Sequence, residues 1–235
     1  MQQAGVISAY LESLTDALGF DRALASSVRQ EVEDHLYEAA ATDSLGDRHD
    51  AERRAVATFG DPYAIAAQFA VVSLAKQSRR VAAAVILVIA STLVTMKARV
   101  AWYAATQWAM NEEMKALAGT VGVVDRYSFW LSVLVGIGSW AYVGARPIPS
   151  DFDPSYRKQL RVFLLLCAAA TGALVVSVIS DGVLTALQLR GTEWSMGFSI
   201  PIVSMAIEIA CIGILVLQIR SIVRRTAFVA ALSKT

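Results

Sequence analysis

The chain has 235 residues, of which 56% are hydrophobic, and its formal net charge at pH 7 is +1. This apolar fraction is too high for an ordinary soluble domain, so the composition excludes a wholly soluble protein. The small net charge hides an asymmetry, because residues 1–70 hold 12 acidic and 5 basic side chains while the remainder holds 8 acidic and 16 basic ones. An acidic N-terminal region of charge −7 therefore precedes a basic, apolar body of charge +8.

The sequence lacks the short motifs of common catalytic and metal sites. It contains no CxxC, HExxH, Walker-type or GxSxG pattern. Both cysteines, Cys167 and Cys211, lie inside apolar runs, where they are interpreted as small buried hydrophobes. No secretory signal peptide is visible, since the first long apolar run begins only after Arg80. We therefore expect a protein that is not an enzyme and that binds no cofactor or metal.

Three short helices are predicted in the acidic region. Apolar residues at helical spacing indicate a first helix over residues 10–18, which Gly19 ends. Asp21 is expected to cap the second helix and Asp50 the third. The third helix is expected to bury Ala55, Val56 and Phe59.

The second of these helices is strongly amphipathic and acidic. Its apolar face consists of Leu24, Val28, Val32, Leu36 and Ala39. Glu31, Asp34 and Glu38 lie mostly off that face, and we take them as a candidate surface for binding a partner protein. His35 shares their side, but a metal site would need ligands from another segment, so packing is preferred to metal binding.

A Gly-Asp-Pro turn follows the third helix, just before the chain becomes apolar. Gly60 is expected to end that helix in a left-handed conformation, and Asp61 to cap the next one. Pro62 suits the first helical position, where its missing N–H costs nothing. Nothing breaks the new helix before Arg79, so a rigid stalk is predicted to lead into the first membrane span. We assign residues 1–78 to an acidic head that includes this stalk, and residues 79–235 to the membrane region.

The head resembles a known type of prefix domain. VRQEVEDHLYEAAA, a loop and AERRAVATFGDPYAIAAQF are similar to the HAAS or DUF1700 pattern, with EVEDHL as its Glu-x-x-His-Leu-like stretch. The resemblance covers about residues 5–75. It implies a small helical module that precedes membrane spans in bacterial proteins, sometimes beside transcription regulators and sometimes fused to transporter permeases. It implies a signalling or regulatory role and no catalytic residue.

Four apolar runs are candidate membrane spans: residues 81–96, 129–145, 162–180 and 199–219. The first run is short for a membrane span unless Lys97 and Arg99 are included in it, with their alkyl stems in the apolar region and their charges at the interface. Residues 97–118, which include Trp108, either extend this span or form an interfacial helix. The predicted fold class is thus all-α, with a small cytoplasmic helical domain and a four-helix transmembrane bundle.

The distribution of positive charge predicts the orientation. With the head inside, the inner segments carry eleven Lys and Arg residues and the outer segments carry five, Arg99 among them. The positive-inside rule then places both termini in the cytoplasm, with the chain as a multi-pass protein of the bacterial inner membrane.

Glu208 is the one acidic residue near the middle of the fourth span. An ionisable group at that depth is costly, so it is expected to face the bundle. Ser204 and Cys211 share its helical side, and Ser177 or Thr171 of the third span are within reach. The preferred interpretation is a protonated carboxyl that is hydrogen-bonded between helices. Proton or ligand sensing and lipid exposure remain as alternatives.

Small residues four apart predict close contacts between helices. The pairs are Ser132 with Gly136, and Ala168 with Gly172. We expect both pairs to pack within one bundle rather than along a dimer seam.

Three functional hypotheses follow from these patterns. The first is a membrane-anchored regulator, anti-sigma-like, whose acidic head binds a cytoplasmic protein with a basic surface, such as a transcription regulator or a sigma factor. The second is an accessory subunit of a membrane transporter. The third, an intramembrane enzyme, is disfavoured because the spans contain no catalytic constellation. The lipid bilayer is an expected partner, direct binding of nucleic acid is not expected of so acidic a head, and a homo-oligomer is left open.

Overall fold

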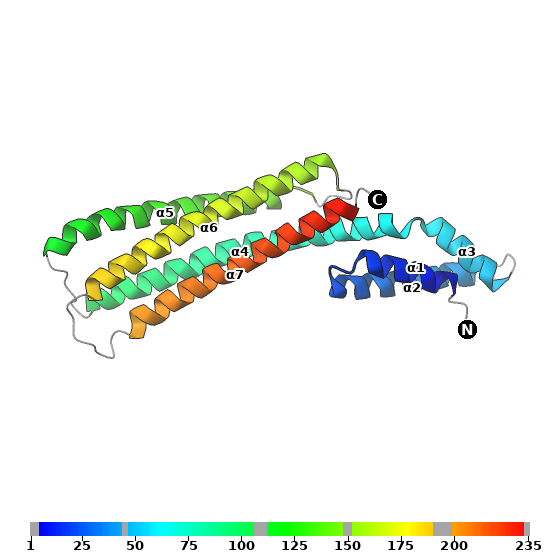
Figure 1. Cartoon of the computed structure of the whole chain (residues 1–235), viewed down its shortest axis with the longest axis horizontal. Coiled ribbons are helices and arrows are strands. Elements are labelled where there is room, and N and C mark those ends of the chain that lie inside the picture. Colours follow the sequence, from blue (N-terminus) through cyan, green and yellow to red (C-terminus); the bar gives the residue numbers. More distant parts are fainter. Residues whose placement is uncertain (1–4, 44–46, 106–111, 148–151, 190–198, 233–235) are drawn as a thin grey trace. The chain divides into compact units, whose positions relative to one another are not determined.

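The computed structural model describes residues 5–43, 47–105, 112–147, 152–189 and 199–232 (Figure 1). Within these residues the chain is all-helical, without strands, as the sequence predicts. The helices are α1 (Val6–Ala17), α2 (Arg22–Thr42), α3 (Arg48–Phe59), α4 (Pro62–Ala105), α5 (Glu112–Gly144), α6 (Pro154–Leu189) and α7 (Ser199–Leu232). Trp108, in the segment predicted either to extend the first span or to form an interfacial helix, lies outside the described residues.

The chain divides into two compact units. Unit 1 comprises Met1–Gln77, Ile148–Arg157 and Ile222–Thr235, and unit 2 comprises Ser78–Pro147 and Lys158–Ser221. Both α4 and α7 contribute residues to each unit.

In unit 1, α1, α2 and α3 pack against one another. Their core is formed by apolar residues spaced three or four apart, which a helix places on one face. The most buried members are Ile7, Leu11, Leu14, Val28, Val32 and Leu36. Tyr10 meets Phe59 edge to face, with ring centroids 6.2 Å apart, which fixes α1 against the end of α3.

Two helix starts in unit 1 depend on aspartate caps. The Asp21 carboxylate accepts a hydrogen bond from the Leu24 N–H at 3.2 Å, so the predicted cap of α2 is confirmed. The predicted cap of α3 at Asp50 is wrong, because the helix begins earlier and Asp47 accepts from the Arg48 N–H at 2.7 Å. The Asp50 N–H already donates to the Asp47 carbonyl, which places Asp50 inside the first turn.

The Gly-Asp-Pro turn ends α3 and starts α4 at the predicted residues, and Gly60 has the positive φ expected of it, but its ψ places it outside the predicted left-handed helical conformation. Gly60 has φ +100° and ψ −165°, a conformation that essentially only glycine adopts. The Asp61 carboxylate accepts from the Tyr63 N–H at 3.2 Å, and α4 begins at Pro62. The helix then continues for 44 residues to Ala105, so residues 97–105 belong to the same helix as residues 81–96.

Four helices are long and apolar enough to cross a membrane: Pro62–Ala105, Lys115–Gly144, Pro154–Leu187 and Ser199–Ala231. Each turns large apolar side chains outward. Leu87, Leu134, Leu165 and Leu217 are between 65% and 71% exposed. Exposed leucines on every helix are unfavourable in water and suit a lipid environment, so the structure is consistent with a multi-pass membrane protein.

One of the two predicted small-residue contacts exists. A Cβ built on Gly136 would lie 2.6 Å from Ile89 Cδ1 and 3.3 Å from Val85 Cγ1, so α5 approaches α4 closely at this glycine. Ala168 and Gly172 are instead exposed, and a Cβ on Gly172 would meet nothing within 4 Å. The expectation of a helix contact at this second pair is wrong. The inward face of α6 passes through Phe163, Cys167, Ala170 and Leu174.

Candidate functional site: a buried charge cluster between α4, α6 and α7

The acidic residues singled out in the head are solvent-exposed. Glu31, Asp34 and Glu38 lie along α2 on the side away from the buried Val32 and Leu36. Their spacing of three and four residues places them on one face of the helix. His35, on the same side, is exposed as well. Among the described residues, no group of three His, Cys, Asp or Glu side chains is arranged to hold a metal ion.

Glu208 faces the interior of unit 2, where it meets a buried arginine. Both Glu208 and Arg99 are 1% exposed. Nη2 of Arg99 donates to Glu208 Oε1 at 3.1 Å, and the Thr95 hydroxyl donates to the same oxygen at 3.0 Å. Glu208 is therefore bound to two side chains of α4, and the bundle-facing orientation follows from these contacts.

A second carboxylate meets the same arginine from α6. Asp181 forms an ion pair with Nη2 of Arg99, the nitrogen that also contacts Glu208. Nη1 of Arg99 donates to the Ser204 hydroxyl at 3.1 Å, and Ser204 donates onward to the Pro201 carbonyl at 2.8 Å. One guanidinium thus joins α4, α6 and α7 through two carboxylates and a hydroxyl.

Helical spacing explains how these side chains converge. On α4, Ser91, Thr95, Arg99 and Tyr103 recur every four residues, which forms a polar row along one side of an otherwise apolar helix. Asp181 and Thr185 repeat the interval on α6, and the Tyr103 hydroxyl lies 3.4 Å from that of Thr185. The row begins at Ser91, whose Oγ lies 4.0 Å from Cys211 Sγ.

The hydrogen-bond partners expected from the third span lie elsewhere. Ser177 donates to Asp125 of α5 at 2.6 Å, and Thr171 donates to the Cys167 carbonyl of its own helix at 2.7 Å. Neither of these bonds involves Glu208, whose partners come from α4. Asp125 is nevertheless part of the same electrostatic environment, because it interacts with the charges of Arg99 and Glu208.

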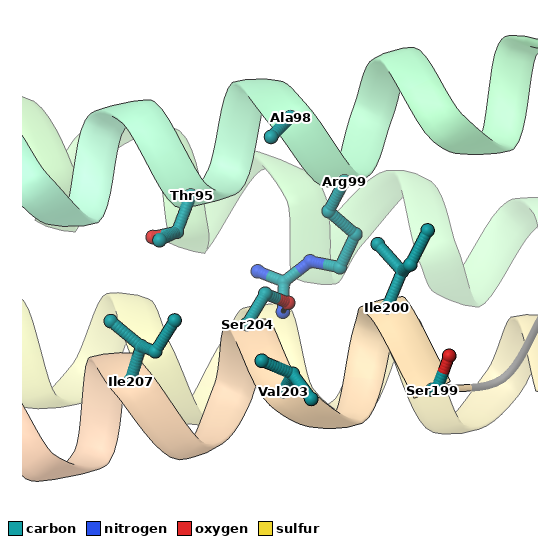
Figure 2. Close-up of a pocket in the computed structure, with 8 residues that line it drawn as sticks. All are labelled: Thr95, Ala98, Arg99, Ser199, Ile200, Val203, Ser204 and Ile207. Carbon is teal, nitrogen blue, oxygen red and sulfur yellow. Dashed lines mark hydrogen bonds between the residues drawn. The ribbon is translucent and has the colours of Figure 1, made fainter.

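A pocket of about 290 Å³ lies beside the cluster, between α4 and α7 (Figure 2). In Figure 2, Arg99 extends from α4 towards α7 and ends beside Ser204. The pocket is lined by Thr95, Ala98, Arg99, Ser199, Ile200, Val203, Ser204 and Ile207. Apolar side chains form most of the wall, while Thr95, Arg99 and Ser204 connect it directly to the cluster.

Sequence reasoning missed Arg99 and Asp181 as site residues. Arg99 was counted among the positive charges outside the first span, and Asp181 directly follows the predicted third span. The polar row every four residues on α4 was the available signal. A buried Glu208 needs a compensating cation, and Arg99 is the cation of that row.

The cluster combines strong attraction with an imbalance of charge. Buried ions are tolerated only when they are paired and hydrogen-bonded, since burial removes their hydration. Arg99 satisfies this condition with donors directed to three groups. The two carboxylates share a single guanidinium nitrogen, so one positive charge is opposed by two acidic groups. Such an arrangement can hold helices together and can also take up a proton.

Comparison of the chain with protein-family models, with curated proteins and with solved structures finds no match.

Proposed function

We propose that the chain is a membrane-embedded regulatory protein whose acidic head binds a cytoplasmic protein with a basic surface. The observation that supports this proposal is the exposed acidic row of Glu31, Asp34 and Glu38 on α2, whose opposite face packs into the core of unit 1. Charge complementarity across such a surface accelerates encounter and makes capture sensitive to salt. A transcription regulator or a sigma factor is the class of partner that fits, because a protein that binds DNA carries a basic face.

Contacts within unit 1 support a role in transmitting a signal. Arg225 of α7 forms a 2.6 Å ion pair with Asp21, the residue that caps α2. Phe228 of the same helix packs against Phe20, with ring centroids 4.7 Å apart. The end of α7 is thus bound to the start of the helix that presents the acidic row. A displacement of α7 would be felt at that helix.

The test is capture by the full-length protein in detergent or nanodiscs at low and at high salt. The triple variant Glu31→Lys, Asp34→Lys and Glu38→Lys should lose a transcription regulator that the wild-type protein retains at low salt. The matched control reverses three other exposed carboxylates, Glu12, Asp16 and Asp50, and so changes the net charge equally. If both triple variants lose the partner alike, net charge rather than the α2 surface is responsible and the proposed binding face is wrong.

We also propose an orientation with both termini in the cytoplasm of a bacterial inner membrane. Leaving out arginines held in ion pairs, Arg99 on the outer side and Arg225 on the inner side, changes the bias from eleven to five into ten to four, which still favours this orientation. Reporter fusions at Ser150 and Thr235 should lie on the same side as Met1, and fusions at Asn111 and Thr192 on the other. These five positions lie outside the described residues. An external Thr235 would contradict the four-span topology.

An accessory subunit of a membrane transporter is the second candidate. It is favoured by the buried Arg99–Glu208 pair, because ionisable residues among membrane helices often belong to transport pathways. Co-purification with an ATPase, together with failure of the head to capture any regulator, would select this function over the first.

A further inference from the structure

The two carboxylates of the buried cluster compete for one nitrogen. Asp181 and Glu208 both contact Nη2 of Arg99, and Glu208 Oε2 has no hydrogen-bond partner among the described residues. We propose that Arg99, Asp181 and Glu208 form a proton-binding site that holds one exchangeable proton on its pair of carboxyl groups. This inference is independent of the partner that the head binds.

The count of charges around the site requires the proton. One guanidinium can neutralise one carboxylate, and two carboxylates on the same nitrogen are too close for both to be ionised in a medium of low dielectric constant. Asp125 of α5 adds a third acidic group to this environment. Lys97, the nearest other cation along α4, is exposed. The remaining neighbours carry hydroxyl groups without charge: Thr95, Ser204, Ser177, Tyr103 and Thr185.

The contacts indicate which oxygen of Glu208 can carry the proton. Glu208 Oε1 accepts from both Thr95 and Arg99, so its other oxygen, Oε2, is the atom left to bear hydrogen. Because Asp181 and Glu208 are coupled through one cation, the proton belongs to the pair rather than to one residue. Binding forms an O–H bond on a carboxylate, and release returns the proton to water.

A proton fits this site better than a metal cation. Calcium takes about six to eight oxygen ligands, and magnesium a near-octahedral set. Here the Thr95 hydroxyl lies within donating distance of Glu208 and of two carbonyls of its own helix, and the Ser204 hydroxyl bridges Arg99 and a backbone carbonyl. The guanidinium itself occupies the position between the two carboxylates and would repel a second cation.

The adjacent pocket brings open space to the polar side chains of the cluster. Thr95, Arg99 and Ser204 belong both to its wall and to the cluster. Its volume of about 290 Å³ is ample for several water molecules. Water in this pocket would reach the side chains that hold Glu208 without unfolding any helix.

Infrared spectroscopy of the full-length protein in lipid tests the proposal, because a protonated carboxyl has a carbonyl stretch that a carboxylate lacks. All variants are compared near neutral pH in an Asp125→Asn background, which removes the half-buried third acid. The parent should show one protonated carboxyl. Glu208→Gln and Asp181→Asn should each lose the band completely, because the remaining acid then has Arg99 to itself. Arg99→Gln should double the band, since neither acid keeps a cation. The control Glu12→Gln should change nothing.

The four intensities discriminate between outcomes without requiring every variant to fold. If Glu208→Gln fails to insert, Asp181→Asn and Arg99→Gln predict opposite changes and still decide the question. A parent without a protonated band overturns the proposal, as does a band that survives Asp181→Asn unchanged. Loss of the band on adding sodium at constant pH would identify a metal-cation site instead. Ala98→Leu, which narrows the pocket, should slow deuterium exchange of the band without changing its intensity.

Discussion

Replacing Gly136 by alanine probes the close approach of α5 to α4. The added Cβ would lie 2.6 Å from Ile89 Cδ1 and 3.3 Å from Val85 Cγ1, both too close for unstrained contact. Overpacking of this kind costs about 1–3 kcal/mol. Alanine gains about 0.5–1 kcal/mol over glycine inside a helix, which offsets part of the cost. Because Ile89 Cδ1 is the end of a flexible side chain, the smaller values apply if that side chain can rotate.

Gly138 supplies a matched control two residues away on the same helix. A Cβ at Gly138 would meet nothing within 4 Å, so Gly138→Ala should only gain the helical term of about 0.5–1 kcal/mol. The free energies of unfolding of Gly136→Ala and Gly138→Ala should therefore differ by about 1–3 kcal/mol. Titration with sodium dodecyl sulfate in mixed micelles, followed by helical circular dichroism, measures this difference.

A double-mutant cycle locates the clash. Ile89→Val removes Cδ1 and should cost about 0.5–1.5 kcal/mol alone, since Ile89 is buried. In that background, Gly136→Ala should lose most of its penalty, which gives a coupling of about 1 kcal/mol or more. If Gly136→Ala and Gly138→Ala agree within about 0.5 kcal/mol, α4 and α5 do not approach as described and the reasoning fails.

Three further predictions concern the buried cation, the turn before α4 and the tyrosine of α1. Arg99→Met should destabilise the protein by about 3–5 kcal/mol, because it leaves the acids Asp181 and Glu208 without their cation. Replacing both acids by leucine in the same protein should recover most of the lost stability. No recovery in this triple variant would contradict the account. Gly60→Ala should cost about 1–3 kcal/mol in thermal unfolding, and Gly60→Asn should not rescue it, since φ +100° with ψ −165° lies outside the left-handed helical region that asparagine tolerates. Burial and, to a smaller extent, the charge of Asp61 raise the pKa of Tyr10, so the folded state holds this proton more tightly than the unfolded state. The contribution of this group to stability should be complete below about pH 10 and should decline as the pH rises further. In Tyr10→Phe this alkaline loss of thermal stability should disappear. If the variant loses stability at high pH as the wild-type protein does, Tyr10 is not the cause.

Much of the fold is predictable because it depends on local sequence. The stop at Gly60 and the start at Pro62 follow from backbone constraints within a few residues. The all-helical fold and the four membrane-length helices follow from long apolar runs. The cap of α3 was misplaced by three residues because Asp47 and Asp50 are chemically equivalent side chains, and only the hydrogen bonds of the folded chain distinguish them.

The candidate site depended on information that local sequence does not carry. That Glu208 faces inward follows from the cost of burying a charge, but its partner depends on the rotation of α4 and α6 about their axes. Arg99 was indistinguishable from an orienting positive charge until that rotation was known. The same limit explains Gly136 and Gly172, which have equivalent local spacing, although only Gly136 faces a neighbouring helix.

The ion pairing of Arg99 has a consequence for the order of membrane assembly. The ribosome makes the cation on α4 first, and Glu208 follows 109 residues later. At about 5–20 residues per second, Arg99 waits roughly 5–20 s for this counterion. During that interval the unpaired arginine makes the transfer of α4 into lipid less favourable, by about 2.5–3.5 kcal/mol on insertion scales. We therefore expect stalled chains that end before α6 to leave α4 at the translocon, whereas Arg99→Leu should release it. Crosslinking of stalled chains to the translocon measures this, and equal crosslinking of both chains would show that α4 settles in lipid without its partners.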